Sequence, residues 1–565
     1  MKILGIWDGH DSGAALIEGD KILFAINEER LSRRKLEVAF PEMSIRACLE
    51  YTGTEISQLS EIAISTSDFA KTLTRVFPSL KEEYYLIRRR KKGPAGTSPF
   101  KKRMKYRLTE YGPSLPTNWI SSSTLQKRLK SIGFKQFRLH LVDHHHAHAA
   151  AAAFCSGFSQ SLVLTLDGVG DGLSGSVYRF ENGRLEKMAS LSARHSLGIF
   201  FEHVTNLLNM RELEDEGKVM ALANYAHPIA DAENPLLNLI AVEGMSVHCR
   251  HSSLGMYEAL RKILWRYPSE QFAYMAQRTL EVKCMQLVQN AIAITGQEHI
   301  CLSGGVFSNV KVNRRLRTLP QVKRCFIFPH MGDGGLALGA ALVANFRLNS
   351  TNRVLLNHLS LGPEYDDVEI EHTLRQNGLS YRKSTDIVRE VARLIAAGEI
   401  VLWFQGRMEL GPRTLGARSI LARPDSTDVK DALNLKLKKR VWYQPFCPAM
   451  LEEDAEEILE DYDGRPNEFM TMAYMVREDK KPLVRGVINV DGTCRPQIIK
   501  KQDTIFHSLL MELKNLTGNG IVLNTSLNIH GEPIVCSPED AVSTFKRTGS
   551  RYMAIQKYLA HCNGP

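Results

Sequence analysis

The sequence has 565 residues, of which 44% are hydrophobic and 24% are charged, and its formal net charge is +10. These are ordinary globular values, so they exclude a disordered chain, and the length favours two folded domains. No apolar run approaches the roughly 20 residues that a membrane-spanning helix needs, so no membrane protein is expected. The ten cysteines form no C-x-x-C pair, which argues against a zinc ribbon and indicates a reducing, cytoplasmic setting.

The first predicted elements form an internal repeat. Residues 2–26 read as a strand, an Asp-Gly pair, a second strand, a tight turn and a third strand, and residues 161–190 repeat this order. The second copy carries Asn-Gly, a strong hairpin signal. Asp8 and Asp167 each follow the first strand of their copy. A duplicated unit of this kind is typical of the two lobes of actin-like ATPases.

The excess positive charge is concentrated between residues 88 and 107, where ten lysines and arginines occur together with glycines and prolines. This composition favours a solvated insertion. The alternative is a patch that collects an anionic substrate or an RNA backbone.

The alanine-rich segment after Asp143 is predicted to be a helix with Asp143 as its N-cap. His144 and His148 then lie on one helical face, at the spacing with which two imidazoles chelate one metal. An exposed histidine run without a ligand role is the alternative. Asp167 and Asp333 precede Gly-rich turns at strand ends and are candidates for the remaining ligands. Imidazole and carboxylate ligands without a thiolate favour Fe(II), Mn(II) or Zn(II).

Two further segments, 299–316 and 324–346, each read as a strand, a Gly-rich turn and a helix. The backbone N–H groups at such helix starts can bind an anion, although neither segment matches a P-loop. His10 lies just beyond the first strand. Its imidazole could take a proton from an acceptor hydroxyl, whereas a solvated loop histidine is the alternative.

A polar segment at 349–359 is predicted to separate a domain over 1–350 from one over 351–565. The second domain reads as mixed α/β. Its predicted elements are helices at 369–378 and 386–398 and strands at 399–405, around 486–490 and at 520–526.

The loop at 406–419 holds three arginines between glycines, and Lys438, Arg440 and Arg495 follow it. Arginine forks match phosphate oxygens bidentately, so several converging arginines indicate an anionic ligand. A salt-bridged surface loop is the alternative, but the glycines and the proline favour a fixed loop shape instead. Residues 524–528 add hydroxyl and amide groups that suit a polar ligand.

These motifs, in this order, resemble the carbamoyltransferase family typified by the nodulation-factor, cephamycin and aminoglycoside enzymes. The resemblance covers nearly the whole chain and includes GHDSGAAL, DHHHAHAAAAAF, EGKVMALA, LSGGVFSNVKVN, GRMELGPRTLGARSIL and NTSLNIHGEPIV. It implies an α/β protein with an N-terminal duplicated actin-like (ASKHA) domain followed by a C-terminal mixed α/β domain that is YrdC-like. It also implies an ATP-dependent O-carbamoyltransferase. The C-terminal domain would convert carbamoyl phosphate and ATP to carbamoyl-adenylate and pyrophosphate, and the N-terminal domain would move the carbamoyl group to a hydroxyl of a small-molecule acceptor.

The same resemblance implies roles for individual residues. The implied catalytic residues are His10, the general base, with Arg418 and Lys438. The implied metal ligands are His144, His148, Asp167 and Asp333. The residues implied to bind nucleotide or donor are Gly304, Gly305, Asn309, Lys218, Arg407, Arg440, Arg495, Ser526 and Asn528. The implied cofactors are ATP with Mg and a divalent metal, Fe(II) first and Mn(II) or Zn(II) as alternatives; no nucleic-acid partner is expected, and a homodimer is one option.

The sequence departs from the family pattern at Val441, Gln444, Asn489, Pro496 and Leu527. Where the family carries an arginine, Gln444 removes one phosphate-binding fork. These changes cluster in the donor-activating domain and leave the donor open. The alternatives are adenylate-dependent transfer of another acyl group, carbamoyl transfer to RNA, and a non-catalytic nucleotide-binding module.

Overall fold

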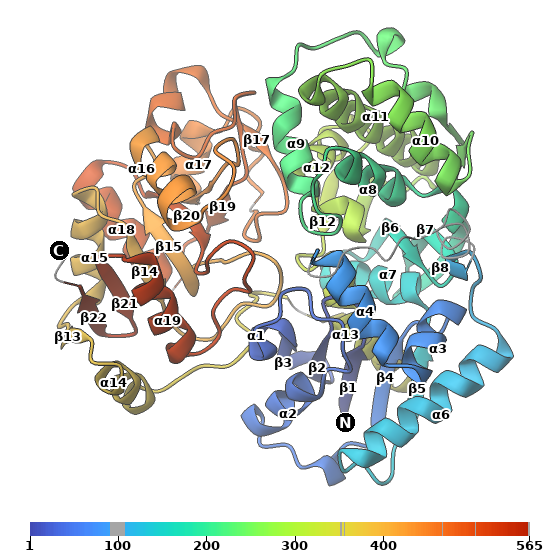
Figure 1. Ribbon diagram of the computed structural model, residues 1–565, viewed down its shortest axis with the longest axis horizontal. Coiled ribbons are helices and arrows are strands. Elements are labelled where there is room, and N and C mark those ends of the chain that lie inside the picture. Colours follow the sequence, from blue (N-terminus) through green and yellow to red (C-terminus); the bar gives the residue numbers. More distant parts are fainter. Residues whose placement is uncertain (91–107, 351–352, 355, 466, 503, 563–565) are drawn as a thin grey trace. The chain divides into compact units, whose positions relative to one another are not determined.

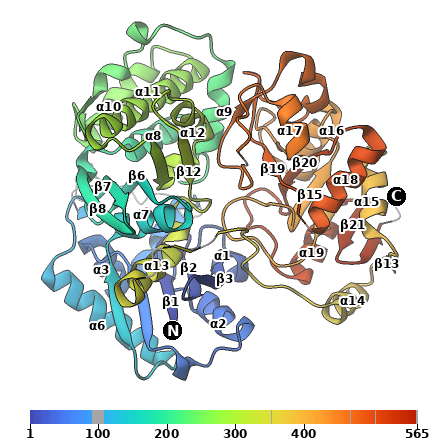
Figure 2. The ribbon, with the colours of Figure 1, turned by 180° about the vertical axis from the view of Figure 1, so that it is seen from behind.

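The computed structural model describes residues 1–90, 108–350, 353–354, 356–465, 467–502 and 504–562 (Figures 1 and 2). The chain divides into two compact units. The first consists of Met1–Ser32 and Leu36–Asn357, and the second of Arg33–Lys35 and His358–Pro565. No helix within the described ranges is long and apolar enough to cross a membrane.

The first unit contains two five-stranded sheets with the same strand order. The orders are β3-β2-β1-β4-β5 and β8-β7-β6-β11-β12. In each sheet the central strand pairs antiparallel with the strand that follows it and parallel with a later one. The strands of the first sheet are β1 Lys2–Trp7, β2 Gly13–Glu18, β3 Lys21–Asn27, β4 Glu61–Ser65 and β5 Arg138–Val142. Those of the second are β6 Gln160–Gly170, β7 Leu173–Glu181, β8 Arg184–Ser192, β11 His299–Ser303 and β12 Arg324–Ile327. The repeat predicted from the sequence is confirmed.

Two buried helices, α7 (His144–Cys155) and α13 (Leu336–Asn349), connect the two sheets. The helix α13 packs on β1, β2 and β4, α7 packs on β6 and β11, and the two helices contact each other. Their small residues allow this close approach, because a Cβ on Gly339 would lie 2.3 Å from the carbonyl oxygen of Ala147. The alanine and glycine content of both helices therefore serves dense packing.

The other helices of this unit lie outside these layers. They are α1 Glu29–Ser32, α2 Glu42–Tyr51, α3 Phe69–Val76, α4 Ser79–Arg88, α6 Leu115–Ser131, α8 Leu197–Leu207, α9 Glu216–Leu222, α10 Ser253–Leu264, α11 Ser269–Thr295 and α12 Val310–Arg317. A small hairpin is formed by β9 (Ile240–Glu243) and β10 (Ser246–Cys249). Both views show α8, α10, α11 and α12 grouped together (Figures 1 and 2), and α8 and α11 contact β6.

The second unit is built on an eight-stranded mixed sheet of order β13-β22-β21-β14-β15-β20-β16-β19. Its strands are β13 Ser380–Lys383, β14 Val401–Phe404, β15 Arg418–Ala422, β16 Cys447–Leu451, β19 Gln497–Ile499, β20 Ile521–Ser526, β21 Tyr552–Ile555 and β22 Tyr558–His561, with a small β17 (Tyr474–Met475) and β18 (Thr493–Cys494) pair. Its helices are α14 Asp367–Gln376, α15 Ile387–Ala396, α16 Thr427–Asp431, α17 Glu452–Ile458, α18 Ile505–Thr517 and α19 Pro538–Thr548. Apolar side chains of α15 and α18 pack with the fully buried Trp403 of β14. The mixed α/β prediction is confirmed, while a specific likeness to YrdC stays a prediction.

The strand predicted around residues 486–490 is wrong. The backbone N–H of Gly486 donates to the carbonyl of Pro424 at 2.8 Å, and that of Val487 donates to the carbonyl of Val484 at 2.8 Å. This segment therefore forms turns after a short 3-10 helix. The hydrogen bonds within this segment and to Pro424 outweigh the β-propensity of its valine and isoleucine residues.

Candidate functional site

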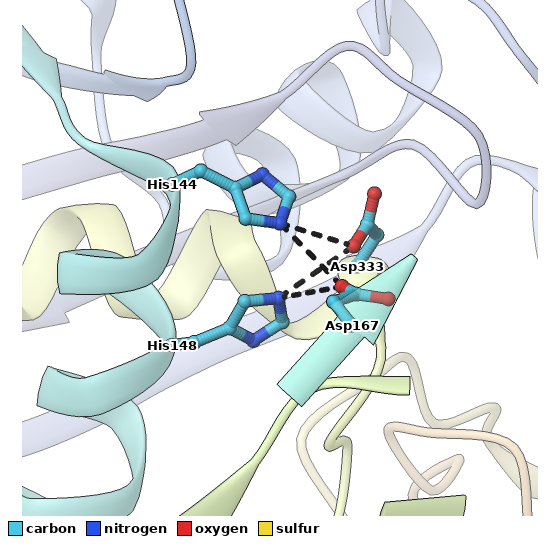
Figure 3. A group of neighbouring side chains, drawn as sticks. All are labelled: His144, His148, Asp167 and Asp333. Atoms are coloured by element: carbon cyan, nitrogen blue, oxygen red, sulfur yellow. Dashed lines mark hydrogen bonds and ion pairs between the residues drawn. The ribbon is translucent and has the colours of Figure 1, made fainter. Parts of the chain in front are cut away.

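Four side chains of the first unit lie together as Figure 3 shows. His144 and His148 come from the first two turns of α7, Asp167 from β6 and Asp333 from the turn before α13, and one ligand atom of each lies within 4.8 Å of the others. The Nε2 atoms of His144 and His148 lie 3.5 and 3.2 Å from Oδ2 of Asp167, and each lies 3.6 Å from Oδ1 of Asp333. Both histidines are buried, so an exposed histidine run is excluded.

A serine orients one of these histidines. The hydroxyl of Ser303 donates to the carbonyl of Met331 at 3.3 Å, so it accepts from Nδ1–H of His148 at 3.1 Å. The lone pair of Nε2 then faces the two aspartates, which is the arrangement that a metal-binding imidazole needs.

A threonine contacts the other histidine. Oγ1 of Thr66 lies 3.0 Å from Nδ1 of His144, and Thr66 has a φ of 70°. This left-handed conformation is unfavourable for a β-branched residue. Neither Thr66 nor Ser303 was found by sequence reasoning, because nothing in their local sequence marks them.

The cluster of His144, His148, Asp167 and Asp333 electrostatically favours a bound cation. Burial opposes a charge on His144, but Asp333 and Asp167 outweigh this effect and raise its pKa to about 9. One buried and one partly buried carboxylate therefore favour a positive charge between them, and a metal that displaces the proton would supply it. With two imidazoles and two carboxylates, the donor set fits a divalent transition metal.

His10 lies beside this cluster, with its Nδ1 3.4 Å from Oδ2 of Asp333. Burial lowers the pKa of His10, although Asp333 opposes the shift. The imidazole is therefore neutral near pH 7, the form that can accept a proton. His10 also lines a small hollow together with Tyr84, Arg88 and Glu212.

The residues predicted to bind nucleotide in this unit divide into two groups. Gly304 and Gly305 lie next to β6, where a Cβ on Gly304 would lie 2.1 Å from the carbonyl oxygen of Leu166 and one on Gly305 would lie 2.9 Å from Oδ1 of Asp167. These glycines therefore let the turn approach the metal cluster closely.

Asn309 and Lys218 make bonds within the unit. Asn309 caps α12 by accepting from the N–H of Val312 at 3.2 Å, and its amide binds Gln277. Lys218 pairs with Asp215 at 2.7 Å. Neither side chain is brought to the metal cluster by a bond that the structure describes.

In the second unit, the structure brings together three predicted residues. Nζ of Lys438 donates to Oδ1 of Asn528 at 2.8 Å and lies 3.3 Å from Oγ of Ser526. Burial and the nearby charge of Arg440 hold the pKa of Lys438 well below its usual range. This amine is therefore buried without a carboxylate partner among the described residues.

Three arginines lie close to one another near Lys438. Burial and the charge of Arg495 lower the pKa of Arg413 to about 9, and burial lowers that of Arg440 to about 10. Arg495 donates to Sγ of Cys447 through Nη2 at 2.8 Å and Nε at 3.1 Å. No described carboxylate pairs with any of the three, so this cluster favours an anion. Sequence reasoning placed Arg413 in the arginine-rich loop without assigning it a role, and it missed Cys447.

The two other arginines for which the sequence predicted a role in the site, Arg407 and Arg418, make hydrogen bonds that stabilise the loop at 406–419. Arg407 donates to the carbonyls of Leu361 and Gly362 at 2.8 and 3.0 Å. Arg418 is fully buried, and its Nη1 donates to the carbonyl of Gln405 at 2.9 Å while its guanidinium lies 3.6 Å from the ring centre of Phe404. Both arginines therefore have a structural part in this loop.

Several buried polar atoms of the second unit have no hydrogen-bond partner among the described residues. They include Oε1 of Gln405, Nη2 of Arg418, Oε1 of Gln444 and Oδ1 of Asn524. Such atoms are rare in folded proteins, and a ligand is one of the partners that satisfy them.

Residues 2–342 match the family model for the carbamoyltransferase N-terminus, and residues 392–561 match that for the carbamoyltransferase C-terminus. The chain belongs to the carbamoyltransferase family. Nodulation protein NolNO of Sinorhizobium fredii is 32% identical to this carbamoyltransferase over 566 residues, which cover 97% of this chain and 78% of the relative. An uncharacterized protein of Methanocaldococcus jannaschii is 30% identical and is matched over 99% of both chains.

The likeness of this chain to solved structures is weaker than its sequence similarity to these relatives. HypF of T. kodakarensis shares 12% identity and a TM-score of 0.36 over 62% of this chain and 48% of its own. A score of this size does not establish a shared fold.

Proposed function

We propose that this carbamoyltransferase uses ATP to activate its donor and transfers the carbamoyl group to a hydroxyl of a small molecule. The observation that carries the proposal is the presence of two chemically different sites. One is the His/Asp cluster with His10 beside it in the first unit. The other is a cluster of arginines with Lys438 in the second unit, without a described carboxylate.

The second unit would activate the donor. Carbamoyl phosphate and ATP are both polyanions, and the charges of Arg413, Arg440, Arg495 and Lys438 suit their phosphates. Water would release inorganic phosphate from carbamoyl phosphate, and the resulting carbamate oxygen would attack the α-phosphorus of ATP. The products would be carbamoyl-adenylate, pyrophosphate and inorganic phosphate, which account for every phosphorus atom.

The first unit would perform the transfer. His144, His148, Asp167 and Asp333 would hold a divalent metal, Fe(II) in the first instance, whose positive charge stabilises negative charge developing on the carbamoyl donor. Nδ1 of His10 faces Asp333, which leaves Nε2 to take the proton of the acceptor hydroxyl.

The proposal includes a fold family for each unit. The repeated strand order of the first unit supports an actin-like domain that binds nucleotide. The mixed sheet of the second unit is consistent with a YrdC-like domain.

A different donor is the second candidate. Gln444 stands where the family carries an arginine, and its buried Oε1 has no partner. The loss of a cationic fork weakens the binding of a donor phosphate, which favours a donor without a phosphate, such as bicarbonate. Acetyl phosphate and bicarbonate, offered in place of carbamoyl phosphate, would separate the two candidates.

The experiment is product identification by mass spectrometry. The full chain is incubated with ATP, Mg and ¹³C-labelled carbamoyl phosphate without an acceptor. Labelled carbamoyl-adenylate is expected from the wild type and from Asp333→Asn, but not from Arg413→Met. Absence of a labelled adenylate from a folded wild type would contradict the proposal.

A further inference from the structure

The thiol of Cys447 lies among the three arginines of the second unit. Arg495 donates two hydrogen bonds to its Sγ, from Nη2 at 2.8 Å and from Nε at 3.1 Å. Burial lowers the pKa of Arg413 and of Arg440, and Cys447 opposes that shift in both. Because no described carboxylate pairs with these arginines, the thiol is the group among them that can carry a negative charge.

The hydrogen bonds from Arg495 bear on the reactivity of this cysteine. A guanidinium that donates to sulfur stabilises the thiolate, which is the form that reacts with oxidants. Cys494, the residue before Arg495, provides the contrast. It is also buried, no arginine within the described ranges donates to its sulfur, and burial raises the pKa of its thiol. The two cysteines are therefore expected to differ in reactivity.

A buried acceptor without a partner stands opposite this thiol. Asn524 of β20 and Cys447 of β16 face each other in the antiparallel ladder, so their side chains leave the same face of the sheet. Asn524 is 2% exposed. Its Nδ2 donates to Oε1 of Gln497 at 3.3 Å and to the carbonyl of Thr414 at 3.4 Å, whereas its Oδ1 has no partner among the described residues. Such an acceptor requires an O–H or N–H donor, and a thiol is only a weak one.

The same face of β20 leads to the lysine of the donor site. Asn524 and Ser526 are two residues apart on this strand, so their side chains share a face. Oγ of Ser526 lies 3.3 Å from Nζ of Lys438. A chemical change at Cys447 therefore occurs beside the groups to which the proposed function assigns the phosphates.

We propose that Cys447 is an oxidation site, at which hydrogen peroxide forms a sulfenic acid that closes the donor site. The thiolate sulfur attacks one peroxide oxygen, so an S–O bond forms as the O–O bond breaks, and the hydroxide that leaves takes up a proton to become water. The sulfur loses two electrons and the peroxide gains them. The new O–H group donates to Oδ1 of Asn524, and the added oxygen competes with a phosphate for the N–H groups of Arg495.

Closure of the donor site rests on the proposed function, whereas the oxidation does not. A sulfenic acid is reduced again by a thiol, so the device is reversible. It would stop the consumption of ATP under oxidising conditions and restore it when a thiol reductant returns.

The oxidation is measured on the full chain without ATP or donor. After treatment with hydrogen peroxide the protein is unfolded in dimedone, which labels sulfenic acids, and each cysteine is followed by peptide mass spectrometry. Cys447 should become labelled at least about ten-fold faster than Cys494.

Variants of Arg495 test the cause of this reactivity. Arg495→Gln removes the charge and should slow the labelling of Cys447 by about ten-fold, while Arg495→Lys keeps the charge and should retain most of the rate. Arg389→Gln on α15, whose side chain is 55% exposed, is the control and should change nothing.

Asn524 is tested through the lifetime of the product. Peroxide is removed by catalase, and dimedone is added after increasing delays. Asn524→Leu removes the acceptor, so it should shorten the lifetime of the sulfenic acid several-fold while leaving its rate of formation unchanged.

Two further measurements test the link to the donor site. Inorganic pyrophosphate, used as a probe of the arginines, should slow the labelling of Cys447 but not that of the partly exposed Cys325. Release of pyrophosphate from ATP by the wild type should stop after peroxide treatment and return after treatment with dithiothreitol.

The proposal is overturned if Cys447 reacts no faster than Cys494, if Arg495→Gln keeps the wild-type rate, or if the oxidised protein still activates its donor at the full rate. Failure of the proposed function is seen separately, as an untreated wild type that releases no pyrophosphate from ATP. The labelling of Cys447 and its protection by inorganic pyrophosphate would be unaffected by that failure.

Discussion

Thr66 adopts an unfavourable backbone conformation that places its hydroxyl beside His144. Its φ of 70° is of a kind that costs a non-glycine residue about 1–3 kcal/mol, and its Oγ1 lies 3.0 Å from Nδ1 of His144. A hydrogen bond to the outer nitrogen of a metal-binding histidine fixes its orientation. We therefore treat Thr66 as a positioning residue of the metal cluster.

Variants of Thr66 separate the effect of its backbone strain on stability from the effect of its hydroxyl on metal binding. Thr66→Gly relieves the backbone strain and removes the hydroxyl, so the thermal midpoint should stay equal or rise while metal affinity falls by about 10–100-fold. Thr66→Ser keeps the hydroxyl and should keep the affinity. Competition with a chromogenic chelator measures both, and equal affinity in Thr66→Gly would refute the positioning role.

The histidines of α7 offer an internal comparison. His148→Ala removes a ligand and should lower the bound metal, measured by elemental analysis, to a small fraction of the wild-type amount. His146 lies on the same helix but outside the cluster, so His146→Ala should keep its metal. Equal loss in the two variants would mean that the helix, and not the ligand, was damaged.

The arginines of the second unit should separate into two kinds. Arg413 lies among like charges, so Arg413→Met should leave stability unchanged or raise it, while activation of carbamoyl phosphate is lost. Arg418 donates to buried carbonyls, so Arg418→Met should lower the free energy of unfolding by about 1–3 kcal/mol. Denaturant unfolding and steady-state kinetics give both quantities, and the opposite assignment would show that Arg418 is the anion-binding group.

At the scale of elements, the contact between α7 and α13 links packing to the metal cluster. Asp333 precedes α13, the two histidines belong to α7, and Gly339 of α13 lies against Ala147 of α7. A shift of either helix therefore moves ligands.

Gly339→Ala tests this coupling. The added methyl group would lie 2.3 Å from the carbonyl oxygen of Ala147, so the variant should lose about 1–3 kcal/mol of stability and bind metal more weakly. A Cβ on Gly217 in α9 would meet no atom within 4 Å, so Gly217→Ala should gain about 0.5–1 kcal/mol. Denaturation and chelator competition on both variants check the contrast, and unchanged metal affinity in Gly339→Ala would contradict the coupling.

Local rules predicted the elements better than the contacts between them. Asp143 was expected to cap α7, and its carboxylate does accept from the N–H of His146 at 2.8 Å. The spacing of His144 and His148 likewise predicted one shared face. Thr66 and Ser303 reach these histidines from distant parts of the chain, and such long-range contacts leave no local pattern.

The same limit explains the arginine-rich loop. The sequence indicated an anion site there, but it could not say which guanidinium groups bind backbone carbonyls and which remain among like charges. Glu409 determines much of the loop's conformation, and with it the positions of these guanidinium groups. Its Oε1 accepts hydrogen bonds from the N–H groups of Leu415 and Ala417. Of the basic stretch, Arg88 and Arg89 form ion pairs, and residues 91–107 lie outside the described residues.

At the scale of the whole molecule, the two units are expected to carry separate half-reactions. Asp333→Asn should abolish carbamoyl transfer yet leave donor activation intact, because Asp333 belongs to the first unit. Arg413→Met should abolish both, because transfer needs the activated donor. Mass spectrometry of adenylate and carbamoylated product follows the two steps, and loss of adenylate formation in Asp333→Asn would contradict the division.

Release of pyrophosphate from ATP shows directly whether this protein activates carbamoyl phosphate as an adenylate. It is measured on the full chain with carbamoyl phosphate as the sole donor, in the wild type, in Arg413→Met and in Arg389→Met, a control on α15 whose side chain is 55% exposed. We expect release that requires carbamoyl phosphate, that is lost in Arg413→Met and that persists in Arg389→Met. Release without carbamoyl phosphate, or none from a folded wild type that binds ATP, would contradict activation of carbamoyl phosphate by this protein.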